Sequence, residues 1–313
     1  MNNEKIRIIA VVGPTASGKS ALALELAKRY GGEIISCDSM QIYKRMNIGT
    51  AKPTKEELAS VPHHMIDVAE PSEVFSSEEY ARLAAKAIED CAARGRLPII
   101  CGGTGLYLDS LLRGGNSAPV CDTEEIRREL NFRLAREGIE PIYEELKVFD
   151  PESAAAIHPN NHKRVIRAME IYLATGTPKS ELDRRSKEQE SMYDACVVGL
   201  FYSERDVLYR RIEKRVDQML AQGLLKETEE LLSEGVFDAN KTAAQAIGYK
   251  ELLGYISGSE SLEEATEELK KATRRYAKRQ MTYFGAKDYI LPLYADGKTF
   301  EEIVNNAARL FSL

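Results

Sequence analysis

The feature that most constrains the fold is an eight-residue loop, GPTASGKS, which covers residues 13–20 and follows the apolar run 6–12. It fits the phosphate-binding pattern G-x-x-x-x-G-K-[ST] at every fixed position, and a helical pattern (21–30) follows it. The glycines of the pattern let the backbone turn tightly, so that successive N–H groups can surround a phosphate. Lys19 adds a positive charge, and the hydroxyl of Ser20 is a Mg²⁺ ligand in this pattern. The loop predicts that a diphosphate or polyphosphate binds to Gly13, Pro14, Thr15, Ala16, Ser17, Gly18, Lys19 and Ser20.

The first third of the chain alternates apolar, strand-like runs with helical patterns. The strand-like runs cover 6–12, 33–37 and 97–101, and the helical patterns cover 18–30 and 77–94. This alternation, with a phosphate loop after the first strand, predicts an α/β fold with a P-loop NTPase-like parallel sheet and helices on both faces. Ligands bind at the carboxyl ends of the strands in such a sheet. The phosphate loop and the segments after the other two strands all fall at that edge.

The segment 120–194 differs from its surroundings because it holds no convincing strand and is rich in charge. We predict three or four helices there, with breaks at 138–141 and 176–178. A strand-like run at 195–201 follows. The sequence therefore predicts a helical insertion domain (120–194) within an α/β core formed by 1–119 and 195–313. The core is expected to end in long helices at 207–235, 242–255 and 262–284.

The net charge of −6 opposes a nucleic-acid partner, but the distribution of charge favours one. Residues 270–287 include seven basic side chains and no acidic one. Lys271, Arg274, Arg275 and Lys278 recur at helical spacing and share one face, with tyrosines interleaved. Such a face suits a phosphate backbone with exposed bases. A solvated helix face balanced by the acidic run 260–268 fits the same spacing.

Composition also predicts the cellular compartment of the protein and argues against a membrane partner. No apolar run approaches the ~18 residues of a membrane span, and the N-terminal residues lack a signal core. Five widely spaced cysteines predict reduced thiols without a zinc site or disulfides. We therefore expect a cytoplasmic protein with no membrane partner and, without heptads, a monomer. The adjacent His63 and His64 are interpreted as packing residues, because no carboxylate or cysteine recurs at ligand spacing.

Two further loops at the predicted ligand edge carry polar side chains. A carboxylate that faces a bound phosphate needs a role, because like charges repel. Asp38 is predicted to hold Mg²⁺ through water or to accept a proton from a nucleophile, and Gln41 to read a base edge. A simple turn is the alternative. The third strand leads into Gly102-Gly103-Thr104, without the acidic residue of a motor ATPase, which leaves Thr104 as a neutral hydroxyl near the phosphates or as part of a plain glycine-rich turn.

Seven segments, in order over nearly the whole chain, resemble the bacterial tRNA dimethylallyltransferases. They are GPTASGKS, DSMQIYKRMNIGTAKPT (38–54), VPHHMID, GGTGLYL (102–108), NHKRVIRAMEIY (161–172), AIGYKE (246–251) and AKRQMTYF (277–284). Many kinases share the phosphate loop, whereas the second and last segments are far more specific. The resemblance implies transfer of a dimethylallyl group from its diphosphate to the exocyclic N6 amine of the adenosine just 3′ of the anticodon.

The resemblance also implies roles for individual residues. The phosphate loop would hold the leaving diphosphate, whose charge Lys19, Arg215 and Mg²⁺ on Ser20 would neutralise. Asp38 would accept the proton of the amine, Thr104 would hydrogen-bond near the reacting groups, and the target base would leave its stack. The helical insertion would grip the anticodon stem. The implied tRNA contacts are Asp38, Ser39, Met40, Gln41, Thr104, Arg127, Lys163, Arg164, Val165, Ile166, Arg167, Gln245, Lys271, Arg274, Arg275 and Lys278.

Three other functions stay open on the sequence alone. A small-molecule kinase shares the phosphate loop and the sheet, but it needs a lid rich in arginine, and no compact lid is evident. A transferase that prenylates free adenine nucleotides would use similar loops, but it needs neither the helical insertion nor the basic helix. A nucleotide-switched RNA-binding module would carry no chemistry. Such a module would keep its affinity after Asp38→Asn, whereas a transferase would bind tRNA and lose turnover.

Overall fold

The protein forms two compact units in a computed structural model that describes residues 5–113, 123–188 and 190–313. One unit consists of Met1–Leu112 and Met192–Leu313, and the other of Arg113–Ser191. The predicted first boundary, between residues 119 and 120, lies outside the described residues. Cys121 lies outside them as well. The second boundary precedes the predicted one at 194/195, because the strand that returns to the first unit already begins at Tyr193.

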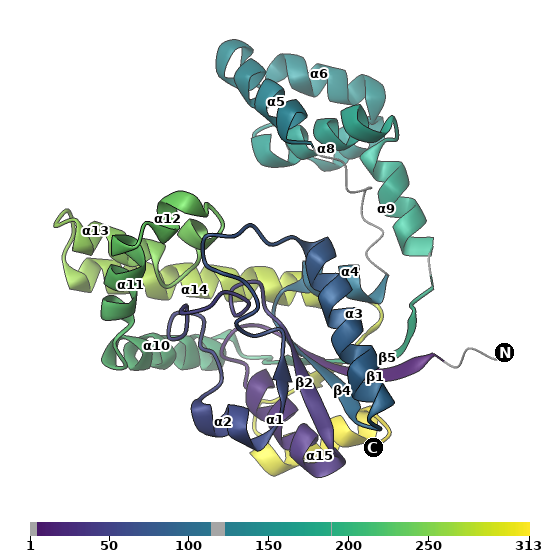
Figure 1. The fold of residues 1–313 in the computed structure, drawn as a ribbon, viewed down its shortest axis with the longest axis vertical. Helices are drawn as coiled ribbons and strands as arrows, with labels where there is room; N and C mark the ends of the chain where they lie inside the picture. The colour runs from purple at the N-terminus through teal and green to yellow at the C-terminus, as the bar shows by residue number, and fades with distance from the viewer. Residues whose placement is uncertain (1–4, 114–122, 189) are drawn as a thin grey trace. The chain divides into compact units, whose positions relative to one another are not determined.

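A six-stranded sheet forms the core of the first unit, in the order β3-β2-β4-β1-β5-β6 (Figure 1). Its strands are β1 Ile6–Val12, β2 Gly32–Cys37, β3 His63–His64, β4 Leu97–Gly102, β5 Tyr193–Phe201 and β6 Ile290–Tyr294. All neighbouring pairs are parallel, which confirms the predicted α/β fold. The sequence analysis missed the two edge strands, since β3 has two residues and β6 contains Pro292, which only an edge position tolerates well.

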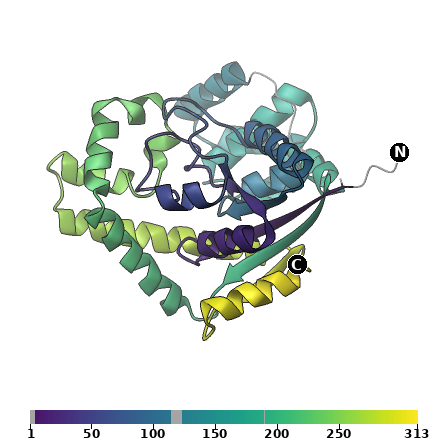
Figure 2. The same ribbon diagram turned by 60° about the horizontal axis from the view of Figure 1, so that its bottom comes forward.

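Helices cover both faces of this sheet, namely α1 Lys19–Tyr30 and α15 Phe300–Leu310 on one, and α3 Ser77–Ala93 and α4 Gly105–Leu112 on the other. Along β1, Ile8, Ala10 and Val12 pack with α3 and α4, whereas Ile9 and Val11 pack with α1 and α15. Successive strand residues point to opposite faces, so an unbroken apolar run needs cover on both sides. Figure 2 shows α15, in yellow, beside β5.

The remaining elements of the first unit correct two predicted helices. They are α2 Lys55–Ser60, α10 Arg205–Ala221, α11 Leu224–Ser233, α12 Val236–Ala239, the short 3-10 helices η1 Ala243–Gln245 and η2 Lys250–Leu252, α13 Leu253–Ile256 and α14 Leu262–Gly285. The single helix predicted over 207–235 is wrong, because Gly223 takes a left-handed φ of 103° and starts a new helix. The helix predicted over 242–255 is also wrong. Two short 3-10 helices form instead, and Gly248 takes a left-handed φ of 110° between them, which a continuous helix does not allow.

The second unit is helical in all the elements that the structure describes. Its helices are α5 Glu124–Glu137, α6 Glu140–Phe149, α7 Pro151–Ala156, α8 His162–Thr175 and α9 Lys179–Glu188. The predicted breaks at 138–141 and 176–178 are confirmed. A further break separates α6 from α7, where Pro151 starts the new helix and Asp150 caps it by accepting a hydrogen bond from the Ser153 amide at 3.0 Å.

Two other expectations of the sequence analysis bear on the fold. No helix in the described residues has the length and hydropathy needed to cross a membrane. Among the same residues, Cys37, Cys91 and Cys101 are buried free thiols, and Cys196 is a half-buried free thiol.

A buried carboxylate ties β2, β3 and α3 together at the amino end of the sheet. One oxygen of Glu33 lies 2.7 Å from His64 Nε2 and 3.1 Å from Cys91 Sγ. This trio is as compact as a set of metal ligands, but Arg94 already supplies a cation 2.6 Å from the same oxygen. The interpretation of His64 as a packing residue therefore needs correction, since it belongs to an ion-pair and hydrogen-bond cluster.

This cluster predicts a pH-dependent contribution of Glu33 to stability. Burial alone would raise the pKa of Glu33, but hydrogen bonds from His64, Cys91 and Arg94 outweigh it and lower the pKa from 4.5 to about 2. A depressed carboxyl pKa stabilises the fold above pH 4.5, and the stabilisation is lost as the pH falls through about 2. We expect Glu33→Gln to lower the free energy of unfolding by about 3 kcal/mol at neutral pH.

Urea unfolding of both proteins between about pH 3 and pH 7 measures this effect. The gap between wild type and Glu33→Gln should narrow as the pH falls, because the wild type loses the contribution that the variant lacks. Glu229→Gln is the matched control, since Glu229 is exposed on α11. A gap of constant size over the whole range would contradict the assignment.

Candidate active site

The register of three neighbouring strands brings the three predicted loops to one edge of the sheet. Gly102 at the end of β4 lies opposite Val12 of β1 and Cys37 of β2. The phosphate loop (13–20), the Asp38 loop (38–41) and the Thr104 loop (103–105) therefore start side by side. The Thr104 amide donates a hydrogen bond to the Cys37 carbonyl at 3.1 Å, which joins the last two loops directly. The expected gathering of these segments is thus confirmed as geometry.

The phosphate loop presents uncapped backbone amides at the start of α1. Its tight turn is closed by a hydrogen bond from the Ser17 amide to the Pro14 carbonyl at 3.2 Å. Gly18 precedes the helix without a side-chain cap, and the first turn of the helix has no acidic residue. The positive end of a helix with free amides favours an anion. Lys19 Nζ lies 3.2 Å from the Pro14 carbonyl, so its charge stays at the loop.

Asp38 and Thr104 shape the loop beside the phosphate site. One oxygen of Asp38 accepts hydrogen bonds from the amides of Met40 at 2.9 Å and Gln41 at 3.4 Å. Within the described residues, the other oxygen makes no hydrogen bond. Thr104 Oγ1 accepts from the Ser39 amide at 3.0 Å and donates to the Ser39 hydroxyl at 3.3 Å. Asp38 therefore keeps one carboxylate oxygen that can bind a ligand or accept a proton. Contacts between the Asp38 loop and the Thr104 loop hold its backbone in place.

The side chains of Met40 and Gln41 serve the protein itself. Met40 packs against the apolar cluster around Tyr43 and Leu224. The Gln41 amide nitrogen donates to the carbonyls of Thr50 and Ala51 at 3.2 Å each, and its oxygen accepts from Ser36 Oγ at 2.9 Å. The prediction that the Gln41 amide reads a base edge is wrong for its N–H donors, because both are used inside the protein.

Two half-buried cations and one phenol lie in the field of Asp38. Burial lowers the pKa of Lys19, and the nearby guanidinium of Arg215 acts in the same direction. Burial also lowers the pKa of Arg215, while the charge of Asp38 acts against it. Burial raises the pKa of Tyr276 on α14, and Asp38 adds to this, while a hydrogen bond with Thr104 opposes it. Arg215 has no carboxylate partner at ion-pair distance in the described chain, so an anion with several charges suits this site.

Sequence reasoning missed the residues that brace the phosphate loop from behind. Gln280 on α14 accepts a hydrogen bond from the Thr15 amide at 2.8 Å. Arg211 Nε donates to the Ala16 carbonyl at 2.8 Å, and the Tyr202 hydroxyl donates to the Ser17 carbonyl at 3.3 Å. One signal was available for Gln280: it falls three positions after the apolar Ala277, on the buried stripe of its helix. A polar residue on such a stripe needs a partner.

Comparisons with known proteins identify the family. The model of a family described as IPP transferase matches residues 41–287. A curated relative from Caldanaerobacter subterraneus subsp. tengcongensis, a tRNA dimethylallyltransferase by name, is 48% identical over 96% of both chains. The chain belongs to the IPP transferase family. The tRNA dimethylallyltransferase of Geobacillus thermodenitrificans is 52% identical, over 89% of this chain and 87% of its own.

Solved structures agree with this membership. The full-length tRNA isopentenylpyrophosphate transferase from Bacillus halodurans has a TM-score of 0.72 and 43% identity, and the match covers 98% of this chain and 97% of the other. A eukaryotic dimethylallyltransferase acting on tRNA has a TM-score of 0.78 at 30% identity, over 98% of this chain and 80% of the other. The resemblance that the sequence segments indicate is therefore confirmed.

In this IPP transferase, the basic face expected on α14 is partly engaged in ion pairs. Arg274 donates to Glu213 of α10 at 2.6 Å, so it joins two helices. Lys271 and Arg275 both lie near Glu268, at 3.0 and 3.4 Å. Lys278 is exposed and forms no ion pair with any residue that the structure describes. The four side chains therefore differ in how freely they could meet a phosphate.

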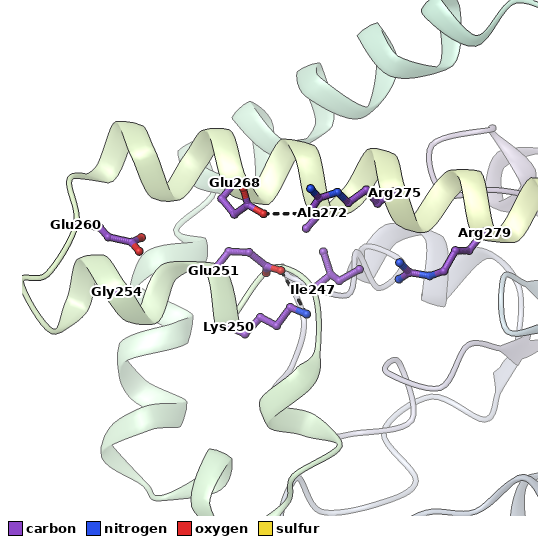
Figure 3. A pocket seen from close by; sticks show the side chains of 9 residues that line it. All are labelled: Ile247, Lys250, Glu251, Gly254, Glu260, Glu268, Ala272, Arg275 and Arg279. Carbon is purple, nitrogen blue, oxygen red and sulfur yellow. Dashed lines mark hydrogen bonds and ion pairs between the residues drawn. The ribbon is translucent and has the colours of Figure 1, made fainter. Parts of the chain in front are cut away.

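A pocket of about 380 Å³ opens beside this face, between α14 and the segment that holds η2 and α13 (Figure 3). Arg275 and Arg279 line it from α14, and Lys250 lines it from η2. Glu251 and Glu268 face the same space, so the lining is of mixed charge. Gln245, five residues before Lys250, is exposed in η1.

The predicted tRNA-binding residues of the second unit fall into three groups. Lys163 and Arg164 are exposed in the first turn of α8. Arg127 and Arg167 both donate to the buried carboxylate of Glu170, at 2.8 and 2.7 Å. Arg127 thereby joins α5 to α8, whereas Arg167 lies on the same helix as Glu170. A third group, Val165 and Ile166, lies in the apolar core of this unit. The prediction that these last two side chains contact tRNA is wrong, because burial removes them from any surface.

The phosphate loop predicts binding of inorganic diphosphate that depends on Lys19. We expect Lys19→Ala to weaken this binding about 10- to 100-fold, the usual effect of losing one charged hydrogen bond. Isothermal titration calorimetry measures it. Lys28→Ala is the matched control, because Lys28 is exposed in the last turn of the same helix. Equal weakening in both variants would show that the loop binds the anion only through general charge.

Proposed function

We propose that this IPP transferase is a tRNA dimethylallyltransferase that acts on the exocyclic N6 amine of the adenosine 3′-adjacent to the anticodon. It takes the dimethylallyl group from dimethylallyl diphosphate and releases diphosphate. One observation carries the proposal: the phosphate loop, an unshared carboxylate oxygen of Asp38 and the cations Lys19 and Arg215 meet at one edge of the sheet. The names of the related proteins support dimethylallyl transfer to tRNA.

The leaving group sets the demands on the phosphate loop. The bond between C1 of the dimethylallyl group and the diphosphate oxygen breaks while charge accumulates on that oxygen, and an allyl cation-like carbon forms. The amides at the start of α1, together with Lys19 and Arg215, would neutralise this charge in the proposed complex. Preorganised donors of this kind stabilise a transition state without reorganisation. No hydrolytic water is required, in keeping with the lack of an acidic residue at the end of β4.

The oxygen donors at this edge fit a Mg²⁺ ion. Ser20 is exposed in the first turn of α1, and Asp38 has an oxygen without a hydrogen bond inside the described chain. Mg²⁺ takes oxygen ligands, with one or two from the protein and the rest from water and phosphate. When bound, the ion would neutralise charge on the diphosphate. Ser20 would hold the ion directly, which leaves the free oxygen of Asp38 for the proton of the amine.

Asp38 completes the transfer on the other side of the reacting carbon. As the bond between N6 and C1 forms, the amine must lose a proton, and the Asp38 carboxylate accepts it. Thr104 holds the loop of Asp38 through the Ser39 amide, and Tyr276 hydrogen-bonds to Thr104. The adenine has to leave its stack to reach this group, as bases do in enzymes that modify them.

Each unit offers basic side chains for the tRNA backbone. In the first unit they are Lys278, Arg275 and Arg279 on α14, and in the second they are Lys163 and Arg164 on α8. We place the enzyme in the cytoplasm, where the free thiols of its described cysteines stay reduced. We also propose that it acts as a monomer, because one chain carries every residue of the proposed chemistry.

A transfer assay tests the proposed function. Purified protein, Mg²⁺ and labelled dimethylallyl diphosphate are incubated in parallel with unmodified tRNA, with AMP, and with ATP plus small acceptors. Label in tRNA alone is the expected result. Label in AMP would favour a nucleotide prenyltransferase, and consumption of ATP without transfer of label would favour a kinase.

Asp38→Asn should separate binding from chemistry. Because an amide cannot accept the proton, we expect the rate of transfer to fall about 10²- to 10⁴-fold, while the affinity for tRNA stays unchanged. Filter binding and single-turnover transfer measure the two quantities. Unchanged turnover in this variant would remove Asp38 from the mechanism, and lost tRNA affinity with normal turnover would assign it to recognition instead.

The exposed start of α8 should contribute phosphate contacts. We expect Lys163→Ala and Arg164→Ala each to weaken tRNA binding and to reduce the slope of log affinity against log salt by about one. Lys147→Ala on α6 is the control, because Lys147 already pairs with Glu144 at 2.6 Å. If all three variants gave the same slope as the wild type, this surface would not face the tRNA.

A further inference from the structure

One buried amide connects three segments that are far apart in the sequence. Gln280 lies on α14 with only 5% of its surface exposed. Its oxygen accepts a hydrogen bond from the Thr15 amide of the phosphate loop at 2.8 Å. Its nitrogen donates to the Gly103 carbonyl, just before Thr104, at 2.9 Å. The side chain thus bridges the loop that would hold the diphosphate and the loop that holds Asp38 in place.

The surroundings of this amide leave little room for another arrangement. A Cβ atom at position 103 would lie 2.2 Å from Gln280 Nε2, so the glycine is what lets the amide approach. The amide also uses both kinds of hydrogen-bonding group, a donor toward one loop and an acceptor toward the other. A buried side chain of similar length without this pair of groups would leave a backbone N–H and a carbonyl unsatisfied, which is costly.

We propose that Gln280 is a positioning residue for the transfer reaction, and that it fixes the distance between the diphosphate loop and the Thr104 loop. This inference rests on the proposed function. Gln280 touches neither the reacting atoms nor the tRNA, since its amide is turned to the two loops. It acts through Thr15 and Thr104, so that the breaking carbon–oxygen bond faces the amine beside Asp38. Small errors in such a distance lower the rate strongly.

The first variant removes the amide but keeps the length of the side chain. We expect Gln280→Met to lower kcat for transfer about 10- to 100-fold and to raise KM for dimethylallyl diphosphate. The affinity for tRNA should stay within about twofold of wild type, because the exposed cations of the helix are untouched. Thr282→Ala is the matched control, since Thr282 is exposed on the same helix. A merely structural role would lower stability and leave both constants of the folded enzyme unchanged.

The second variant replaces the amide with a group whose hydrogen bonding depends on pH. A protonated carboxyl at Gln280→Glu can donate to the Gly103 carbonyl and accept from the Thr15 amide, whereas the carboxylate can only accept. The rate of this variant relative to wild type should therefore recover as the pH is lowered from alkaline to mildly acidic, and Gln280→Met should show no recovery. Parallel pH profiles for both variants would contradict the proposal.

A third variant decides the matter if Gln280→Met does not fold. Gly103→Ala keeps Gln280 but forces its nitrogen away, and we expect the same loss of kcat with tRNA affinity retained. Wild-type kinetics in folded Gly103→Ala would overturn the inference. The wild-type control separates the two proposals. If the wild type transfers no label to tRNA, the proposed function fails. If it does and folded Gln280→Met equals it, only the role of Gln280 fails.

Discussion

The candidate site depends on the register of three parallel strands. Because β4 pairs with both β1 and β2, Gly102 lies opposite Val12 and Cys37, and the three loops that follow start at one edge. No loop has to reach across the sheet to meet the others. Short backbone contacts, such as the hydrogen bond from the Thr104 amide to the Cys37 carbonyl, then suffice to fix them. A slip of one residue in β4 would turn its side chains to the opposite faces and separate the loops.

The balance of charge at this edge explains how the carboxylate of Asp38 can lie close to a site that suits an anion. Lys19 and Arg215 are half-buried, and burial lowers the pKa of both. Each therefore gains from an anionic ligand, which removes part of the cost of keeping a cation out of water. Asp38 offsets them in part but lies on a different loop. The proposed diphosphate and the carboxylate of Asp38 would therefore both help to balance the charge of these two cations.

Local patterns predicted the parts of the protein that depend on neighbouring residues, namely the phosphate loop, the three inner strands that precede the loops, and α14. They failed where partners come from far away. Gln280 meets Thr15 across 265 positions, and its place on a buried helix stripe signals only that it needs a partner, not which one. Val165 and Ile166 were predicted to contact tRNA together with their basic neighbours. Their spacing to Met169 is instead typical of a buried helix face. Lys163 and Arg127 carry equal charge and are both exposed, and only the structure shows that Glu170 engages Arg127.

The most direct test of the central claim is to find the atom that receives the prenyl group. Unmodified tRNA is incubated with the protein and dimethylallyl diphosphate, digested with nucleases, and analysed by tandem mass spectrometry. The diphosphate released in the same reaction is quantified. The account predicts one dimethylallyl group on the adenine of the nucleoside 3′-adjacent to the anticodon, with one diphosphate released for each. Diphosphate released without a prenylated nucleoside, or a prenyl group elsewhere in the tRNA, would contradict it.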